Sequence, residues 1–412
     1  DPTTRRAMML RKRNTNLPEA QKAHGAAKAN VDPPAKRAAS KQAPSKNEED
    51  FQGIGEPKPK RAVLAELTTK LSNGLVLNSV RKGLGVRKSG NGQLPRQATK
   101  GYEKRAPLAE AEDVIVEEAK TFDPCPGYDY DAENKNDEFS VPDYAFEIHQ
   151  YLRGREKDYA VGDYMKSQPK LSKEARAVLV DWMIEVQETF ELNHETLYLS
   201  VKVLDTYFQN TKKKVRQEEL QMLASAAIFV VSKYEERSPP LIDDFIYLSE
   251  DSYKRTDLEE AERDLFRTVA FDLGAPLSYS QLRRYAKASK SDMRALTLAR
   301  YILETSLMIY EFVSASESKM AAGAFLLALR MIDEKAEWTP VMHKYSGYSA
   351  EEVEPWVWAL NHMMHIRASG RGAYAQQHTV SDKYSHEIFF ESTKVPLIAD
   401  KFALKSPIVC PE

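Results

Sequence analysis

The stretch KEARAVLVDWMIEV, residues 173–186, decides the fold, because it predicts a helix with apolar side chains on more than one face. Four of these side chains follow the i, i+3, i+4, i+7 spacing of an amphipathic helix: Ala175, Val178, Leu179 and Trp182. Three more lie off that stripe and need burial of their own: Val180, Met183 and Ile184. A surface helix of a globular protein needs only one apolar face. The second face therefore predicts a further contact.

Charge and aromatic residues divide the 412-residue chain into two parts. Residues 1–108 contain 23 Lys and Arg against 9 Asp and Glu, a net charge of +14, although the whole chain carries -2. Of the 39 aromatic residues, only Phe51 lies within the first hundred positions. A basic segment without aromatics buries too little apolar surface to offset the entropy lost on ordering. We therefore predict a disordered basic tail over residues 1–120 and an acidic folded part after it.

Cysteine usage and hydropathy exclude several classes of protein. The two cysteines, Cys125 and Cys410, lie at opposite ends of the part that we expect to fold. This argues against a disulfide framework and a multi-cysteine zinc site, and it suits a reducing compartment. No run of 18 apolar residues occurs and no signal-peptide pattern opens the chain, so we do not expect membrane insertion. The chain begins with Asp1 rather than Met, so we expect an initial segment to be missing.

Beyond about residue 140 the sequence predicts an all-α fold, since helical patterns of about fifteen residues alternate with short polar breaks. Two segments echo each other at a spacing of 97 residues: LQMLASAAIFVVSKYEE (220–236) and KMAAGAFLLALRMIDE (319–334). Small residues precede bulky ones in both, and Lys233 falls opposite Arg330. Small side chains let helices approach on every side, as the central helix of a bundle requires. We predict two bundles of about five helices; the alternative is two unrelated buried helices.

The helix at 173–190 would open the first bundle, with one face toward the bundle centre. The face that carries Val178, Leu179 and Trp182 would then be left over. An exposed tryptophan with aliphatic neighbours is typical of a protein-docking surface.

Several segments, in the right order, resemble a cyclin. ARAVLVDWMIEV (175–186) resembles the first helix of the cyclin box, and SKYEERSPP (232–240) resembles the end of its third helix. PDYAFEIHQYLR (142–153) is similar to the helix that precedes the box in A- and B-type cyclins. FELNHETLYLSVKVLDTYF (190–208) and KYSHEIFFE (383–391) are most similar to the third subtype of mitotic B-type cyclins.

The resemblance covers about residues 140–400 and implies two tandem five-helix cyclin boxes behind a preceding helix and the tail. The division of the chain that we expect is a tail at 1–120, a linker with a helix at 121–172, an N-terminal box at 173–275, a C-terminal box at 276–371 and an extension at 372–412.

The resemblance also implies a function without enzymatic activity or a cofactor. Cyclins bind a cyclin-dependent kinase and push its regulatory helix into place, which positions a glutamate against the ATP-binding lysine and helps to open the activation segment. We therefore expect a mitotic cyclin-dependent kinase as partner, and control of mitotic, and by extension meiotic, progression.

By the same resemblance, Lys233 and Glu262 are the paired charges that hold the kinase helix. Lys233 ends the small-residue helix, where a cation suits the helix C-terminus. Glu262 begins a face with Phe266, Val269 and Leu273 at i+4, i+7 and i+11, which predicts a carboxylate at the rim of an apolar pocket. The alternative is an ordinary surface pair worth under about 1 kcal/mol. The other candidate kinase contacts lie beside this pair or on the preceding helix: Tyr234, Phe266, Leu273, Tyr144, Ile148 and Tyr151.

The leftover face of the opening helix would correspond to the substrate-docking patch of the family, which receives Arg-x-Leu motifs. Its parts would be Val178, Leu179, Trp182, Glu185, Leu220 and Gln221. Glu185 would pair with the arginine of the motif. Ala175 stands where the family usually has methionine, and losing that flexible side chain makes the groove shallower. We therefore expect weaker or more selective docking than in A-type cyclins.

The tail contains short motifs that a partner can read. RAVLAEL (61–67) places Arg61, Leu64 and Leu67 three residues apart and resembles the destruction box, by which mitotic regulators are recruited to the ubiquitin ligase of anaphase. The asparagine that often follows is absent. Basic clusters at 11–13 and 58–61 can be read by nuclear import receptors or by nucleic acid, and the alternative is a solvated charge run. Together with the subtype resemblance they predict a nuclear protein.

Other classes of protein fit less well. A transcription-initiation factor with paired cyclin-like folds must neutralise phosphates with a basic core, whereas the folded part here is acidic; we expect no direct contact with nucleic acid. A helical scaffold would need more than two repeats to form a solenoid. The eight histidines are scattered without a metal-binding or catalytic spacing, so we expect no metal, and His194 and Cys125 are more readily structural than catalytic.

Overall fold

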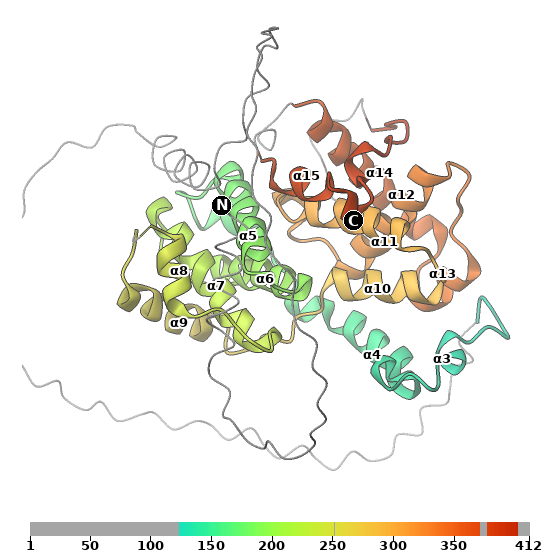
Figure 1. The fold of residues 1–412 in the computed structure, drawn as a ribbon, viewed down its shortest axis with the longest axis horizontal. Helices are drawn as coiled ribbons and strands as arrows, with labels where there is room; N and C mark the ends of the chain where they lie inside the picture. Colours follow the sequence, from blue (N-terminus) through green and yellow to red (C-terminus); the bar gives the residue numbers. More distant parts are fainter. Residues whose placement is uncertain (1–122, 251, 371–376, 403–412) are drawn as a thin grey trace, which may run out of the picture. The chain divides into compact units, whose positions relative to one another are not determined.

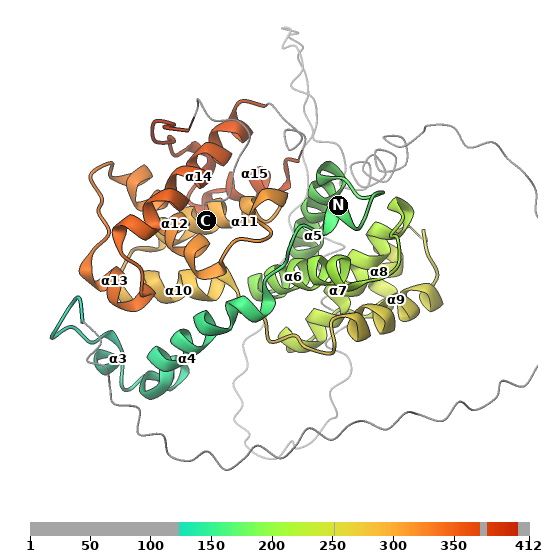
Figure 2. The ribbon, with the colours of Figure 1, turned by 180° about the vertical axis from the view of Figure 1, so that it is seen from behind.

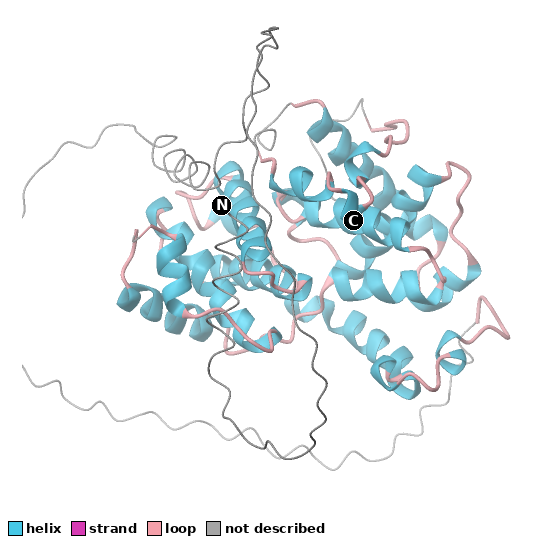
Figure 3. Ribbon diagram, in the orientation of Figure 1, coloured by secondary structure: helices cyan, strands magenta, loops and turns pink. Residues whose placement is uncertain are grey.

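The computed structural model describes residues 123–250, 252–370 and 377–402. Every regular element in these ranges is helical, and Figure 3 shows no strand in the part of the chain that is coloured by structure. The all-α prediction is thereby confirmed. The predictions for the basic tail, including the destruction box at Arg61, Leu64 and Leu67 and the two basic clusters, lie outside the described residues.

Helices α5 to α9 form the first bundle (Figures 1 and 2). Their bounds are Lys173–Thr189, His194–Asn210, Leu220–Glu235, Ile242–Leu248 and Arg255–Thr268. The central helix is α7, which packs against α5, α6 and α9. Its small residues Ala224, Ala226 and Ala227 are fully buried, so the neighbouring helices approach its backbone closely. The role predicted for the 220–236 segment is confirmed.

Helices α10 to α14 form the second bundle, with bounds Ser278–Ala288, Met293–Ser306, Glu317–Ile332, Pro340–Ser346 and Ala350–Ala368. Here α12 is central and packs against α10, α11 and α14. Gly323 is required at the crossing with α14, because an added Cβ would lie 2.6 Å from Cβ of Trp356. Each of the two segments that echo each other in the sequence is thus the central helix of a five-helix bundle, as predicted.

Further helices flank the bundles. Before the first bundle lie α3 (Tyr130–Glu133) and α4 (Pro142–Arg155), and after the second lies α15 (Thr379–Tyr384). Pro142 occupies the first turn of α4, where its missing N–H costs nothing. Single turns of 3-10 helix lie at Glu138–Ser140, Glu156–Tyr159, Tyr164–Lys166, Gln217–Glu219, Tyr310–Phe312, Glu387–Phe389 and Ser392–Lys394.

The contacts of α5 explain its two apolar faces. The helix begins after Ser172, whose hydroxyl accepts a hydrogen bond from Ala175 N at 3.1 Å. It packs against α6 and α7 of its own bundle and also against α15, from the far end of the chain. Thr379 of α15 donates to a carboxylate oxygen of Asp181 at 2.8 Å. The second face therefore contacts the C-terminal part of this same chain.

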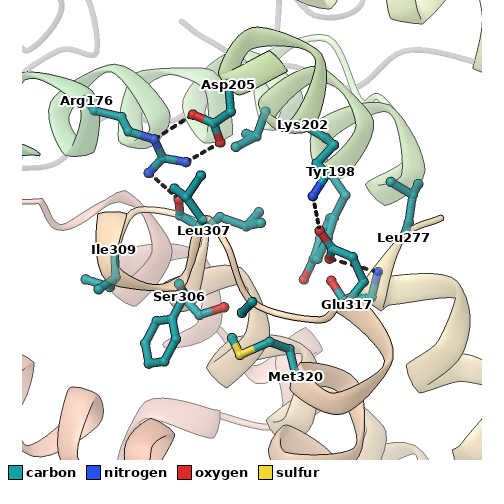
Figure 4. A pocket seen from close by; sticks show the side chains of 15 residues that line it. Arg176, Tyr198, Lys202, Asp205, Leu277, Ser306, Leu307, Ile309, Glu317 and Met320 are labelled. Carbon is teal, nitrogen blue, oxygen red and sulfur yellow. Dashed lines mark hydrogen bonds and ion pairs between the residues drawn. The ribbon is translucent and has the colours of Figure 1, made fainter. Parts of the chain in front are cut away.

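A second contact joins the two bundles beneath α5 and α6, as Figure 4 shows. The guanidinium of Arg176 donates to both carboxylate oxygens of Asp205, at 2.8 and 2.6 Å, and to the carbonyl oxygen of Leu307 at 2.9 Å. Nearby, Lys202 pairs with Glu317 at 3.1 Å. Arg176 and Asp205 are buried, so the second bundle supplies an acceptor to a charged pair of the first.

Candidate functional site

The structure brings Lys233 and Glu262 together, as predicted. Lys233 lies in the last turn of α7 and forms an ion pair with Glu262, which lies midway along α9. Their side chains are 39% and 26% exposed. The Lys233 ammonium also lies 3.9 Å from the ring centroid of Phe229. A partly exposed pair of this kind costs little to open, so both charges are available to a ligand.

Aromatic side chains accompany this pair. Tyr234, next to Lys233, is exposed, and Phe266, one turn after Glu262, is half-buried. The ring of Phe271 meets that of Phe266 edge to face, with centroids 5.0 Å apart, and its side chain is 59% exposed. Sequence reasoning missed Phe271 and Phe229. Phe271 lies beyond the end of α9, where helical spacing does not apply.

The face predicted along α9 contains fewer residues in the structure than the helical spacing in the sequence predicts. The helix ends at Thr268, so Val269 and Leu273 do not continue the line from Glu262 and Phe266. Val269 is instead buried in the core, and Leu273 lies in the segment between the bundles. The cause is the backbone of Ala270 and Phe271, with φ of 55° and 61°, and Phe271 N–H donates to the Phe266 carbonyl at 3.0 Å.

A second candidate surface lies on α4. Tyr144, Ile148 and Tyr151 are exposed and recur at i, i+4 and i+7, so they form one apolar stripe. The opposite side of the helix is anchored to the second bundle. Arg153 donates to the Tyr345 carbonyl at 2.9 Å, and His149 lies 3.3 Å from the side-chain oxygen of Gln281. Three apolar side chains on one exposed stripe are available to a partner.

Of the six residues of the predicted docking patch, three are buried and three are partly exposed. Trp182 is 2% exposed and belongs to the core, so the prediction of an exposed tryptophan is wrong. Leu179 and Leu220 are buried as well. Helix α5 packs against α6 and α7 of its own bundle, and the side chains of both Trp182 and Leu220 belong to the hydrophobic core. Three members are partly exposed: Val178, Glu185 and Gln221. A docking role for this patch stays a prediction.

His194 has a structural environment. Burial lowers the pKa of His194 to about 3, in spite of Glu304, whose carboxylate oxygen lies 3.6 Å from Nδ1. The imidazole packs on the ring of Tyr279, with centroids 5.1 Å apart. A neutral, packed imidazole of this kind stabilises the boundary between the bundles and is a poor proton shuttle at neutral pH.

The part of the chain that the structure describes offers neither a metal-binding cluster nor a membrane-spanning helix. Within residues 123–250, 252–370 and 377–402, no group of three or more His, Cys, Asp or Glu side chains has the geometry to hold a metal ion. Among the helices of those same ranges, none combines the length and the apolar character needed to cross a bilayer.

Comparison with known proteins identifies the family. The model of the cyclin N-terminal domain matches residues 147–274, and that of the cyclin C-terminal domain matches residues 275–397. The G2/mitotic-specific cyclin-B3 of Caenorhabditis elegans is 47% identical over 298 residues, which cover 72% of this chain and 76% of that protein. The cyclin-B3 of Drosophila melanogaster is 46% identical over 278 residues, and that of Gallus gallus is 42% identical over 266 residues.

The matches cover different shares of the relatives. The aligned region spans 66% of this chain and 47% of the Drosophila protein, and 65% of this chain and 64% of the Gallus protein. This chain thus spans about half the length of the fly relative. The two domain matches and these identities confirm the predicted resemblance: the chain belongs to the cyclin family of cell-cycle regulators, and within it to the mitotic B-type cyclins, with its greatest similarity to the B3 group.

Proposed function

We propose that this chain is a regulatory subunit that binds and activates a cyclin-dependent kinase, and that it has no catalytic activity of its own. The observation that carries the proposal is the partly exposed ion pair of Lys233 and Glu262 beside exposed aromatic side chains. A kinase helix needs charged groups to cap and orient it and an apolar surface to bury its own side chains. The ends of α7 and α9 offer both.

The binding face would act on the regulatory helix of the kinase. Lys233 can bind partner carbonyl groups, because a lysine ammonium has three donors, and among the described residues this one pairs with Glu262 and lies over the Phe229 ring. Phe266 and Phe271 would pack against apolar side chains of that helix, and Leu273 would extend the same surface. Fixing the helix places the active-site glutamate of the kinase against its ATP-binding lysine, which is a condition for phosphoryl transfer.

The stripe of Tyr144, Ile148 and Tyr151 would give the kinase a second contact. Its three exposed side chains are large and apolar, and such residues dominate the energetics of protein interfaces. Two separate surfaces on one chain bind a rigid partner more tightly than either alone, provided that their spacing fits.

Three finer points belong to this proposal. Substrates with Arg-x-Leu motifs would dock at Val178, Glu185 and Gln221 once Trp182 becomes accessible. The destruction box at Arg61, Leu64 and Leu67 would recruit the ubiquitin ligase of anaphase and end the activity. The basic clusters of the tail would direct the protein to the nucleus. The relatives are named G2/mitotic-specific cyclin-B3, which supports a mitotic role, and we extend this role to meiosis.

The experiment that tests kinase activation uses the full chain and a purified mitotic cyclin-dependent kinase, with histone phosphorylation as readout. We expect wild type to activate the kinase, and Lys233→Ala and Glu262→Ala each to lose most of the activation at limiting concentration. The matched control is Arg330→Ala. Arg330 occupies the same place at the end of α12 and pairs with Glu354 at 2.9 Å, but on the second bundle. Wild type that fails to activate, or an Arg330→Ala variant as defective as the other two, would contradict the proposal.

A further inference from the structure

The two candidate kinase surfaces belong to different parts of the structure. The stripe on α4 is anchored to the second bundle through Arg153 and His149, and Glu156, just after α4, accepts from Ser316 Oγ at 2.6 Å and from Ser318 N at 2.9 Å at the start of α12. The face around Lys233 and Glu262 belongs to the first bundle. A kinase that touches both surfaces requires them to keep a fixed spacing.

A cluster of three side chains connects these surfaces. Arg155, the last residue of α4, donates from its guanidinium to the hydroxyl of Tyr159. Tyr159 in turn donates to Asp272, with its hydroxyl 2.9 and 2.8 Å from the two carboxylate oxygens. Arg155 also lies 3.9 Å from Asp272 directly. We call these three residues the Asp272 cluster; it joins α4 to the segment that follows α9.

The Asp272 cluster contacts the α4 stripe and adjoins the face around Lys233 and Glu262. The guanidinium of Arg155 lies 5.7 Å from the ring centroid of Tyr151, the last residue of the α4 stripe, and 4.9 Å from that of Tyr159. Asp272 follows Phe271 in the sequence, and the ring of Phe271 meets that of Phe266 on the face beside Glu262. Asp272 is therefore linked to Tyr151 of the α4 stripe through Arg155, and it is the direct neighbour of Phe271 in the chain.

The backbone around Asp272 is held in an unusual conformation. Ala270 and Phe271 adopt left-handed φ values of 55° and 61°, which cost energy in residues other than glycine. Asp272 offsets part of that cost, because its carboxylate accepts from Gly274 N at 2.9 Å as well as from Tyr159. An added Cβ at Gly274 would lie 3.3 Å from both the Tyr159 hydroxyl and the Asp272 carboxylate, so these groups would have to shift slightly to accept it.

The charge state of Asp272 suits this role. Partial burial acts to raise the pKa of Asp272, but the hydrogen bonds from Gly274 and Tyr159 and the charge of Arg155 together lower it below the ordinary value. The carboxylate is therefore ionised at neutral pH and accepts from all of its donors at once. Because its side chain is 51% exposed, replacing it should leave the fold intact.

We propose that the Asp272 cluster of Arg155, Tyr159 and Asp272 is a positioning device that holds the α4 stripe and the face around Lys233 and Glu262 at the spacing that the kinase requires. This rests on the proposed kinase binding and adds residues that make no kinase contact themselves. Loss of the cluster leaves each surface intact but lets their spacing vary. The affinity for the kinase then falls, because binding has to fix the spacing of the two surfaces at a cost in conformational entropy.

The chain offers a matched control for the test. Asp264 on α9 accepts a hydrogen bond from the Tyr207 hydroxyl at 2.8 Å and forms an ion pair with Lys213 at 2.9 Å. It therefore repeats the combination of a carboxylate, a tyrosine and a cation. This second cluster lies within the first bundle, where it joins α9 to α6 and to the loop that follows α6. Asp264→Asn and Tyr207→Phe remove the same groups as Asp272→Asn and Tyr159→Phe without affecting the spacing.

The experiment measures the Kd of the full chain for a purified cyclin-dependent kinase, together with the Tm of each free variant. We expect Asp272→Asn to raise Kd about tenfold and Tyr159→Phe somewhat less, with Tm shifts no larger than those of the two controls. A double-mutant cycle separates positioning from simple stabilisation. Tyr151→Ala should cost less affinity in the Asp272→Asn background than in wild type, because α4 is then no longer held in place.

Each outcome has a definite meaning. If wild type binds and Asp272→Asn matches Asp264→Asn in affinity, the positioning role is overturned while the proposed function stands. Strictly additive losses for Tyr151→Ala and Asp272→Asn also overturn it. If wild type shows no binding, the proposed function fails and this inference fails with it.

Discussion

Lys383 of α15 forms an ion pair with Glu304 of α11 at 2.5 Å, and the two side chains are 2% and 0% exposed. Lys383 also donates to the side-chain oxygen of Gln187 on α5 at 2.8 Å. A single ammonium group therefore holds the C-terminal helix to the second bundle and to the opening helix of the first. This contact is the reason that the second apolar face of α5 is closed.

Replacing Lys383 by methionine should strongly destabilise the protein. The carboxylate of Glu304 would remain buried. The Tyr384 hydroxyl, 2.8 Å away, would still donate a hydrogen bond to it but would bring no compensating charge. Breaking one side of a buried ion pair costs about 3–5 kcal/mol. Urea unfolding of the full chain measures this loss. The control is Lys394→Met, since the Lys394 pair with Glu391 lies at the surface and its loss should change little. Equal effects at both positions would show that the buried pair has no special role.

A double variant separates charge from packing. Lys383→Met combined with Glu304→Gln removes both charges and leaves a neutral amide that Tyr384 can still bind. We expect it to recover part of the stability lost in Lys383→Met, because the uncompensated charge is gone. A double variant less stable than the single one would mean that packing, and not charge, dominates.

Acidification should destabilise the fold through His194. Its folded-state pKa of about 3 lies below the unfolded value, so the unfolded chain binds the proton more readily as the pH falls through about 6.5. The free energy of unfolding should therefore fall by about 2 kcal/mol between pH 7 and pH 5 from this residue. His194→Gln removes that contribution, which is measured as the difference between variant and wild type at each pH. His386→Gln, at an exposed histidine, is the control; a pH dependence unchanged by His194→Gln would refute the assignment.

Two glycine substitutions should act in opposite directions. Gly323→Ala places a Cβ 2.6 Å from Cβ of Trp356, which the crossing of α12 and α14 cannot accept without a shift. We expect a loss of about 1–3 kcal/mol from overpacking. Gly154→Ala in α4 meets nothing within 4 Å and should gain about 0.5–1 kcal/mol from helix propensity. Thermal unfolding of both variants checks the sign; a neutral Gly323→Ala would mean that the helices separate freely.

The sequence predicts those features that depend on local pattern. The small residues of α7 and α12 and the cation near the end of each central helix follow from residue type and spacing. The pairing of Lys233 with Glu262 came from the resemblance, because α7 and α9 are separate helices and spacing alone does not pair them.

Contacts between distant segments were not predictable in the same way. Helix α15, nearly two hundred residues further along the chain, packs against α5, and no local pattern reports that contact. The end of α9 was misplaced because Ala270 and Phe271 adopt left-handed φ values without the glycine that usually marks such a turn. Asp272 carries no motif at all, since its importance depends on Tyr159, more than a hundred residues earlier.

The most direct test of the central claim is the affinity of the full chain for a purified cyclin-dependent kinase, compared between Glu262→Ala and Glu354→Ala. Both variants remove a glutamate that pairs with the cation at the end of a central helix, one in each bundle. If the first bundle carries the kinase site, Glu262→Ala should weaken binding by about 2–4 kcal/mol, roughly 30- to 1,000-fold in Kd, while Glu354→Ala binds like wild type. Equal affinity for the two variants would contradict the account.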